Sequence, residues 1–160
     1  MTPSLPLPPP AHAPSHYRSK TLAAWLALLL GPLGAHRIYL HGWRDPWAWL
    51  YPLPTLAGLT GVLRMRELGQ DDRLAWVLVP LLGLTISVAM LTGIVHALTP
   101  DEKWDARHNP GRAVTPTGWG PVLAAIAGLM VGGTVLMGTI AFSGQKFFEW
   151  QLGSTPVARP

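Results

Sequence analysis

Cysteine is absent from the 160 residues of this chain. Its absence excludes disulfides, thiolate metal sites and cysteine nucleophiles. Charge is scarce as well, since only 12% of the residues are charged, compared with about 25% in an ordinary soluble domain. Two long stretches, 74–95 and 122–142, contain no ionisable residue at all. These absences point to an apolar environment rather than to water.

The apolar stretches predict transmembrane helices. A helix of about 20 apolar residues, rising about 1.5 Å per residue, crosses a hydrocarbon core of about 30 Å. The stretches 74–95 and 122–142 meet this requirement directly, and 21–35 and 47–63 are shorter apolar segments. We therefore predict an all-α integral membrane protein with four transmembrane helices arranged as two hairpins. The predicted parts are a disordered proline-rich arm at 1–17, a first hairpin at 18–70, a second hairpin at 71–145 with a polar loop at 99–118, and an interfacial or disordered tail at 146–160.

The first apolar segment is too short to span by itself. Its fifteen residues, 21–35, reach only about 22 Å as a helix. To span the membrane, the helix must continue through His36 and Arg37, with the guanidinium reaching back to the head groups. Gly31 and Pro32 favour a kink in this half. The sequence leaves open whether the helix breaks there.

Four spans place both termini on one side of the membrane. In this arrangement seven Lys and Arg residues lie on the side of the termini and five on the other side, so the positive-inside rule favours cytoplasmic termini. The net charge of +4 is not gathered into a basic patch of the kind that binds nucleic acid. Nine arginines against three lysines, with abundant Ala, Gly, Leu and Pro, are typical of a GC-rich bacterial genome. The predicted location is therefore a bacterial inner membrane.

A short motif joins the first two apolar segments. The stretch GPLGAHRIYL, 31–40, follows Lys20 and the first apolar run, and Glu67 follows the second. This pattern resembles the TM-two family, which has two transmembrane helices joined by Gly, one residue, His-Arg, a large residue and Tyr-Leu-Gly, with an acidic residue after the second helix. The residues that match the family pattern are Gly34, His36, Arg37, Tyr39, Leu40 and Glu67. The match covers about residues 20–68, and here His41 stands before the glycine.

The resemblance implies a hairpin and no particular reaction. In such a hairpin Lys20 and Glu67 lie at the same membrane face, where they can form a weak ion pair. The motif residues His36, Arg37 and Tyr39 lie at the opposite face. Three roles for them remain open: an interfacial anchor, contact with a partner or a lipid head group through Arg37, and proton handling or ligand chemistry at a histidine.

Small residues recur at four-residue spacing in the last apolar stretch, at Ala124, Gly128 and Gly132. This spacing lets two helices approach closely, either within the chain or between two copies of it. Carboxylate pairs, nucleophile–histidine pairs, phosphate-binding loops and metal-ligand spacings are not found. We therefore predict a protein that is not an enzyme and needs no cofactor or metal. Its expected role is interaction or regulation, with the lipid bilayer, another membrane protein or a second copy as partner. The alternative is a small oligomeric channel or transporter.

Overall fold

The computed structural model describes residues 17–154 and contains helices and no strand in that range. The all-α prediction is confirmed. The predicted proline-rich arm, apart from Tyr17, and residues 155–160 of the predicted tail lie outside the described residues. The elements are α1 (Lys20–Leu30), η1 (Gly31–Leu33, a 3₁₀ turn), α2 (Ala35–His41), α3 (Pro46–Leu50), α4 (Pro52–Leu68), α5 (Arg73–Leu98), α6 (Asp101–His108) and α7 (Gly120–Ser154).

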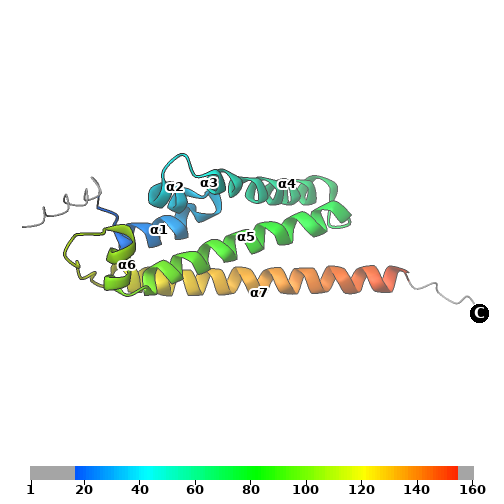
Figure 1. Ribbon diagram of the computed structural model, residues 1–160. Helices are drawn as coiled ribbons and strands as arrows, with labels where there is room; N and C mark the ends of the chain where they lie inside the picture. The colour runs from blue at the N-terminus through cyan, green and yellow to red at the C-terminus, as the bar shows by residue number, and fades with distance from the viewer. Residues whose placement is uncertain (1–16, 155–160) are drawn as a thin grey trace, which may run out of the picture.

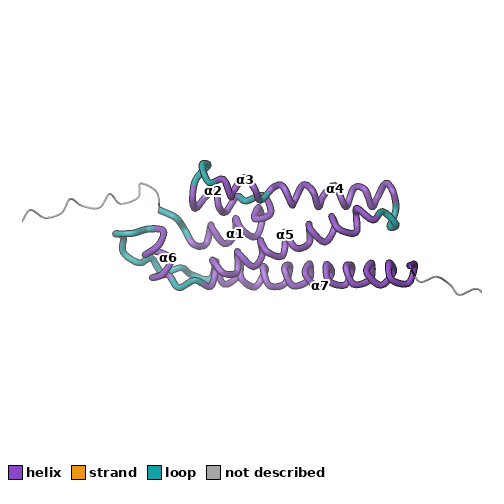
Figure 2. Tube along the Cα trace, turned by 45° about the vertical axis from the view of Figure 1, so that its right-hand side comes forward, coloured by secondary structure: helices purple, strands orange, loops and turns teal. Residues whose placement is uncertain are grey.

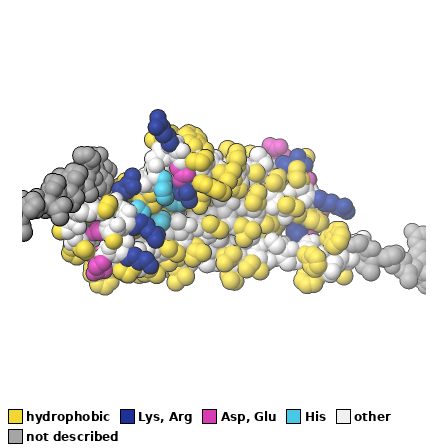
Figure 3. Space-filling model, viewed as in Figure 1, with side chains coloured by type: hydrophobic (Ala, Val, Ile, Leu, Met, Phe, Trp, Pro, Cys, Tyr) yellow, Lys and Arg dark blue, Asp and Glu magenta, His cyan; other side chains and the backbone are white. Residues whose placement is uncertain are grey.

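Within residues 17–154, two helices are long and apolar enough to cross a membrane. They are Arg73–Leu98 in α5 and Gly120–Gly153 in α7, whereas the first apolar helical stretch, Lys20–Leu33, is shorter. The prediction of four spans is therefore not confirmed. Charged side chains gather at the two ends of the bundle, and apolar side chains cover much of the face between them (Figure 3). Figure 1 shows α5 and α7 running side by side along the length of the bundle.

The first apolar segment does not run through the bundle. Gly31 lies against Ala89, which is in the interior of α5, and the chain then turns back through η1 into α2. The Ser19 amide donates a hydrogen bond to the Tyr39 hydroxyl at 2.8 Å, so α2 returns to the end where α1 began. The expected helix through His36 and Arg37 is thus replaced by a hairpin that enters and leaves at one end, seen in Figure 2 as the folded pair α1 and α2.

Local chemistry explains this reversal. Pro32 has no backbone N–H and cannot continue the ladder of α1, and it occupies the first turn of the 3₁₀ helix that follows. Gly34 then adopts a left-handed conformation with φ of 78°, which side chains disfavour and glycine does not. The Thr55 hydroxyl donates to the Pro32 carbonyl at 2.6 Å. This hydrogen bond gives the Pro32 carbonyl of the turn a partner on α4.

The chain next crosses the bundle in α3 and α4. The Asp45 carboxylate accepts a hydrogen bond from the Trp47 amide, and Pro46 occupies the first turn. Both residues are typical of a helix start. A kink at Tyr51 and Pro52 separates the two helices. A Cβ atom built on Gly58 would lie 2.5 Å from the Leu82 Cβ. Glycine at this position therefore lets α4 pack closely against α5.

Ion pairs and a ring contact close the end of the bundle where α4 meets α5. Arg64 makes two hydrogen bonds to the carboxylate of Asp72, at 2.8 and 3.1 Å. The Lys146 ammonium lies 5.1 Å from the Trp76 ring and bonds to Glu149. Lys146 and Glu149 belong to α7, which continues unbroken to Ser154 through the segment expected to form a separate interfacial tail.

The segment that leads into α1 and the C-terminal end of α7 lie at opposite ends of the bundle (Figure 1). The four-span prediction places both termini on one side, because it counts the first apolar segment as a full crossing. In the structure this segment forms the folded pair α1 and α2 instead of one long helix. One end of the bundle holds Tyr17, α6 and the loop between α2 and α3, and we call it the α6 end. We call the opposite end the far end.

Candidate functional site

The motif at 34–40 builds the hairpin itself. A Cβ on Gly34 would lie 2.5 Å from the carbonyl oxygen of Ala48, so this position needs glycine both for its backbone angle and for the closeness of α3. Leu40 is 3% exposed and packs with Ala23 and Trp104. Tyr39 holds the start of α1 through its hydroxyl. Three of the motif positions are therefore explained by local folding.

Arg37 is engaged within the chain. Its Nε atom donates to the Asp45 carboxylate at 2.9 Å, which joins α2 to the loop that starts α3. The His41 imidazole lies 3.8 Å from the same carboxylate. Asp45 is 9% exposed and Arg37 is 29% exposed at the side chain. The guanidinium is therefore directed to a neighbouring acid, and lipid or a partner would have to compete with Asp45 for it.

Lys20 does not pair with Glu67. Glu67 is exposed near the C-terminal end of α4, at the far end of the bundle, whereas Lys20 stays at the α6 end because α1 and α2 fold back. The Lys20 ammonium instead binds the Asp101 carboxylate and the Thr99 carbonyl. Burial alone would raise the pKa of Asp101, but hydrogen bonds from Lys20 and Thr117 outweigh it and lower the pKa to about 2. This ion pair anchors the start of α1 to α6.

A buried polar network surrounds that ion pair. Asp105 and Asn109 are 3% and 1% exposed and bond to each other at 2.7 Å. The Asn109 side chain holds the backbone of Arg18, and the Asp105 carboxylate accepts the Thr115 amide. The sequence predicts a polar loop with a short helix through Arg107, and α6 is that helix; the buried network around it is not predicted. The signal that could have indicated a folded cap was a group of acids followed, within one loop, by threonines whose amides can donate hydrogen bonds to them: Asp101, Asp105, Thr115 and Thr117.

Two histidines meet beneath this cap. His36 of α2 is 2% exposed, and its ring centroid lies 6.0 Å from that of His96 on α5, with the planes tilted by 54°. The Nδ1 atom of His36 and the Nε2 atom of His96 are buried and have no hydrogen-bond partner. The contact depends on the reversal of the chain between α1 and α2, so the sequence alone does not indicate it.

Aromatic rings enclose the histidine pair. Tyr51 meets His36 edge-on at 5.4 Å, and Trp104 meets His96 edge-on at 5.6 Å. His108 lies against the other side of Trp104, with ring centroids 4.1 Å apart. Burial lowers the pKa of His108, and the positive charges of Arg107 and Arg18 lower it further. The hydrogen bond with the Trp104 carbonyl raises the pKa but does not outweigh these effects. The rings thus form a row from α2 to α6.

The chemistry available to this cluster is limited. Among residues 17–154, no group of three or more His, Cys, Asp or Glu side chains is placed to hold a metal ion. The histidine pair offers two nitrogen atoms and no carboxylate. It can therefore hold a proton, a water molecule or an ion that accepts two ligands.

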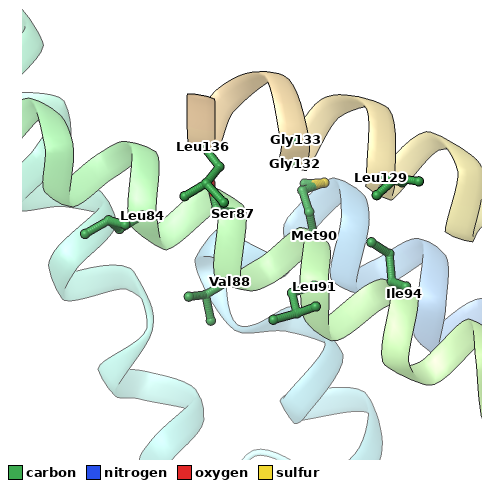
Figure 4. A pocket seen from close by; sticks show the side chains of 11 residues that line it. Leu84, Ser87, Val88, Met90, Leu91, Ile94, Leu129, Gly132, Gly133 and Leu136 are labelled. Atoms are coloured by element: carbon green, nitrogen blue, oxygen red, sulfur yellow. The ribbon is translucent and has the colours of Figure 1, made fainter. Parts of the chain in front are cut away.

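The small residues of α7 pack inside the chain. Ala124 is fully buried, a Cβ on Gly128 would lie 3.0 Å from Ile94 and Leu28, and a Cβ on Gly132 would lie 2.7 Å from the Met90 Cβ. These contacts let α7 approach α5 and α1. In Figure 4 the Met90 side chain reaches from α5 toward Gly132 and Gly133.

An apolar groove runs beside this contact. It has a volume of about 290 Å³ and lies between α5 and α7. A second hollow of about 380 Å³ lies between α5 and the α3–α4 segment. Leu84 and Val88 line both hollows, so α5 forms a ridge with a groove on each side. Figure 4 shows the lining of the groove between α5 and α7.

Comparisons of the chain with protein families, curated proteins and solved structures find no match.

Proposed function

We propose that the chain is an integral membrane protein with three crossings and one re-entrant hairpin. The distance from Arg73 to His96 along α5 is about 34 Å at 1.5 Å per residue, which suits a hydrocarbon core of about 30 Å. The α3–α4 segment, 46–68, has a similar length. The irregular turn at η1 is enclosed by α4 and α5, as non-helical backbone at membrane depth must be.

The positive charges favour the α6 end as the cytoplasmic side. Of the eleven Lys and Arg residues among 17–154, seven lie at this end and four at the far end. The seven are Arg18, Lys20, Arg37, Arg44, Lys103, Arg107 and Arg112, and the four are Arg64, Arg66, Arg73 and Lys146. The positive-inside rule then places the far end, with Ser154, outside the cytoplasm. We also propose that this membrane is a bacterial inner membrane. We propose that the chain is related to TM-two proteins, which the local roles of Gly34, Tyr39 and Leu40 support.

The proposed role is non-enzymatic: the protein binds a helix of another membrane protein along α5. The observation that carries this proposal is the ridge. Five apolar side chains recur at alternating spacings of four and three residues and are 48–66% exposed: Leu84, Val88, Leu91, Val95 and Leu98. This is the spacing of a helix–helix seam. Grooves on both sides of the ridge offer the shape into which the side chains of a second helix fit.

The alternative of a pore lined by hydroxyl groups has less support. The hydroxyls of Thr85, Ser87 and Thr92 on α5 each donate to the carbonyl four residues earlier, at 2.7–2.8 Å. Thr134 and Thr139 on α7 do the same. Their donors are therefore satisfied within their own helices. A solute passing these groups would find only acceptor lone pairs.

Photo-crosslinking in native membranes tests the proposed role. A photoreactive amino acid at Leu91, on the ridge, is compared with one at Met130, which is similarly exposed on α7. We expect a discrete adduct with a different membrane protein from position 91 and only lipid adducts from position 130. Lipid adducts alone from both positions would contradict the proposal. Adducts of the chain with itself at position 91 would favour a homo-oligomer instead.

A further inference from the structure

The histidine pair has two nitrogen atoms in need of a partner. The His36 Nδ1 and the His96 Nε2 are each buried and without a hydrogen bond. Leaving one buried polar atom unsatisfied costs about 1–3 kcal/mol, and in native proteins such an atom commonly has a bound water or ion as its partner. Here two such atoms belong to neighbouring rings contributed by α2 and α5. A single bound species between the rings would satisfy both of them.

We propose that His36 and His96 bind one soft monovalent cation, which in a cell is Cu(I). An ion held between two imidazole nitrogens at about 2 Å from each separates the ring centroids by about 6 Å. The observed separation is 6.0 Å. Two-coordinate binding is an ordinary geometry for Cu(I), and imidazole is a suitable ligand for copper. The site therefore needs no third protein ligand.

Charge selects the monovalent ion. Both ligands are neutral, and in the described part of the chain no third His, Cys, Asp or Glu joins them. The cost of moving an ion out of water rises with the square of its charge, so a divalent ion loses far more here without a carboxylate or thiolate to offset it. Zinc also requires about four ligands. A single positive charge is the most that two imidazoles in this setting stabilise.

The surroundings suit a cation of low charge. The titratable or charged groups that act on the pair are Arg37 and His41 from the hairpin and His108 from α6. The Arg37 charge is offset by Asp45 at 2.9 Å. Tyr51 and Trp104 pack on the two imidazoles and shield them from water. An apolar, water-poor site favours Cu(I) over the more strongly hydrated Cu(II).

The test uses the full-length protein in detergent, under anaerobic reducing conditions, with a chromogenic Cu(I) chelator as competitor. We expect one Cu(I) per chain. His36→Phe and His96→Phe keep an aromatic ring and remove the ligand, and each should weaken binding by at least about tenfold. His41→Phe is the matched control, because its side chain is 54% exposed and lies outside the pair. Absence of Cu(I) binding by the wild type, or unchanged binding by the two ligand variants, would overturn the proposal.

A second measurement needs no variant. X-ray absorption at the copper edge of the loaded wild-type protein should show two nitrogen neighbours at about 2 Å. Sulfur neighbours, or four ligands, would overturn the assignment to His36 and His96. The copper site and the α5 ridge use different residues, so loss of copper binding leaves the crosslinks from position 91 unchanged. Failure of one proposal is therefore distinguishable from failure of the other.

Discussion

Lys20 and Asp101 are 81 residues apart in sequence and form an ion pair at the α6 end. The Lys20 side chain is 7% exposed and that of Asp101 is 22% exposed, so the pair is largely removed from water. Lys20 begins α1 and Asp101 begins α6. One contact thus holds the re-entrant hairpin against the cap that follows α5.

We predict that this ion pair makes stability fall at low pH. The pKa of Asp101 in the folded protein is about 2, below its ordinary value of 3.8. Because the pKa of Asp101 is lower in the folded than in the unfolded protein, its contribution to stability is fully present above the unfolded-state pKa. The contribution is lost as the pH falls through about 4 toward about 2. The loss should be about 2 kcal/mol. Thermal unfolding in detergent at a series of pH values measures it.

Asp101→Asn is the matched variant for this pH effect. It should be less stable than the wild type at pH 7 by about 2–3 kcal/mol, because it leaves the Lys20 charge without its acid. Its stability should change less than that of the wild type between pH 4 and pH 2. An equal acid loss in both proteins would assign the effect to another carboxylate.

Gly34→Ala should destabilise the hairpin by about 2–3 kcal/mol. Alanine is strained at the positive φ of this position. In addition, the new Cβ would lie 2.5 Å from the Ala48 carbonyl oxygen and clash with it. Gly111→Ala is the control, since Gly111 also has a positive φ, of 81°, but nothing lies within 4 Å of its Cβ position. It should lose only about 1 kcal/mol. Equal losses in thermal unfolding would show that the contact with α3 is unimportant.

Gly132→Ala tests the packing of α7. The added Cβ would lie 2.7 Å from the Met90 Cβ, so we expect the helices to separate and the protein to lose about 1–3 kcal/mol. Gly133→Ala should have little effect, because nothing lies within 4 Å of that position. Size-exclusion chromatography with light scattering checks the alternative. A change of oligomeric state with unchanged stability would indicate that Gly132 lies in a seam between copies.

The re-entrant hairpin predicts an unusual labelling pattern. The chain contains no cysteine, so single cysteines can be introduced without a background. A cysteine at Tyr17 should react with a membrane-impermeant reagent from the side opposite to one at Gln70. Positions 17 and 103 should share a side, because both lie at the α6 end. Reaction of positions 17 and 70 from the same side would instead support four full crossings.

Much of the helical structure follows from local sequence. Asp45 and Pro46 start a helix, and Gly69 ends one, for reasons contained within a few residues. The length of apolar sequence in α5 is equally a local property. The helix-breaking character of GPLG is readable too, and the sequence analysis left open a break at Gly31–Pro32. These features depend on backbone hydrogen bonding and side-chain polarity, which act over short distances.

Only the tertiary structure decided the direction of the chain after that break. A kink within a spanning helix and a full reversal use the same residues, and the difference lies in distant partners: Ala89 beside Gly31, Thr55 for the Pro32 carbonyl, and Ser19 for the Tyr39 hydroxyl. The reversal in turn decided that Lys20 meets Asp101 rather than Glu67, and that His36 meets His96. The apolar sequence determined that the chain forms long helices, whereas packing between distant segments determined which of its few polar groups come together.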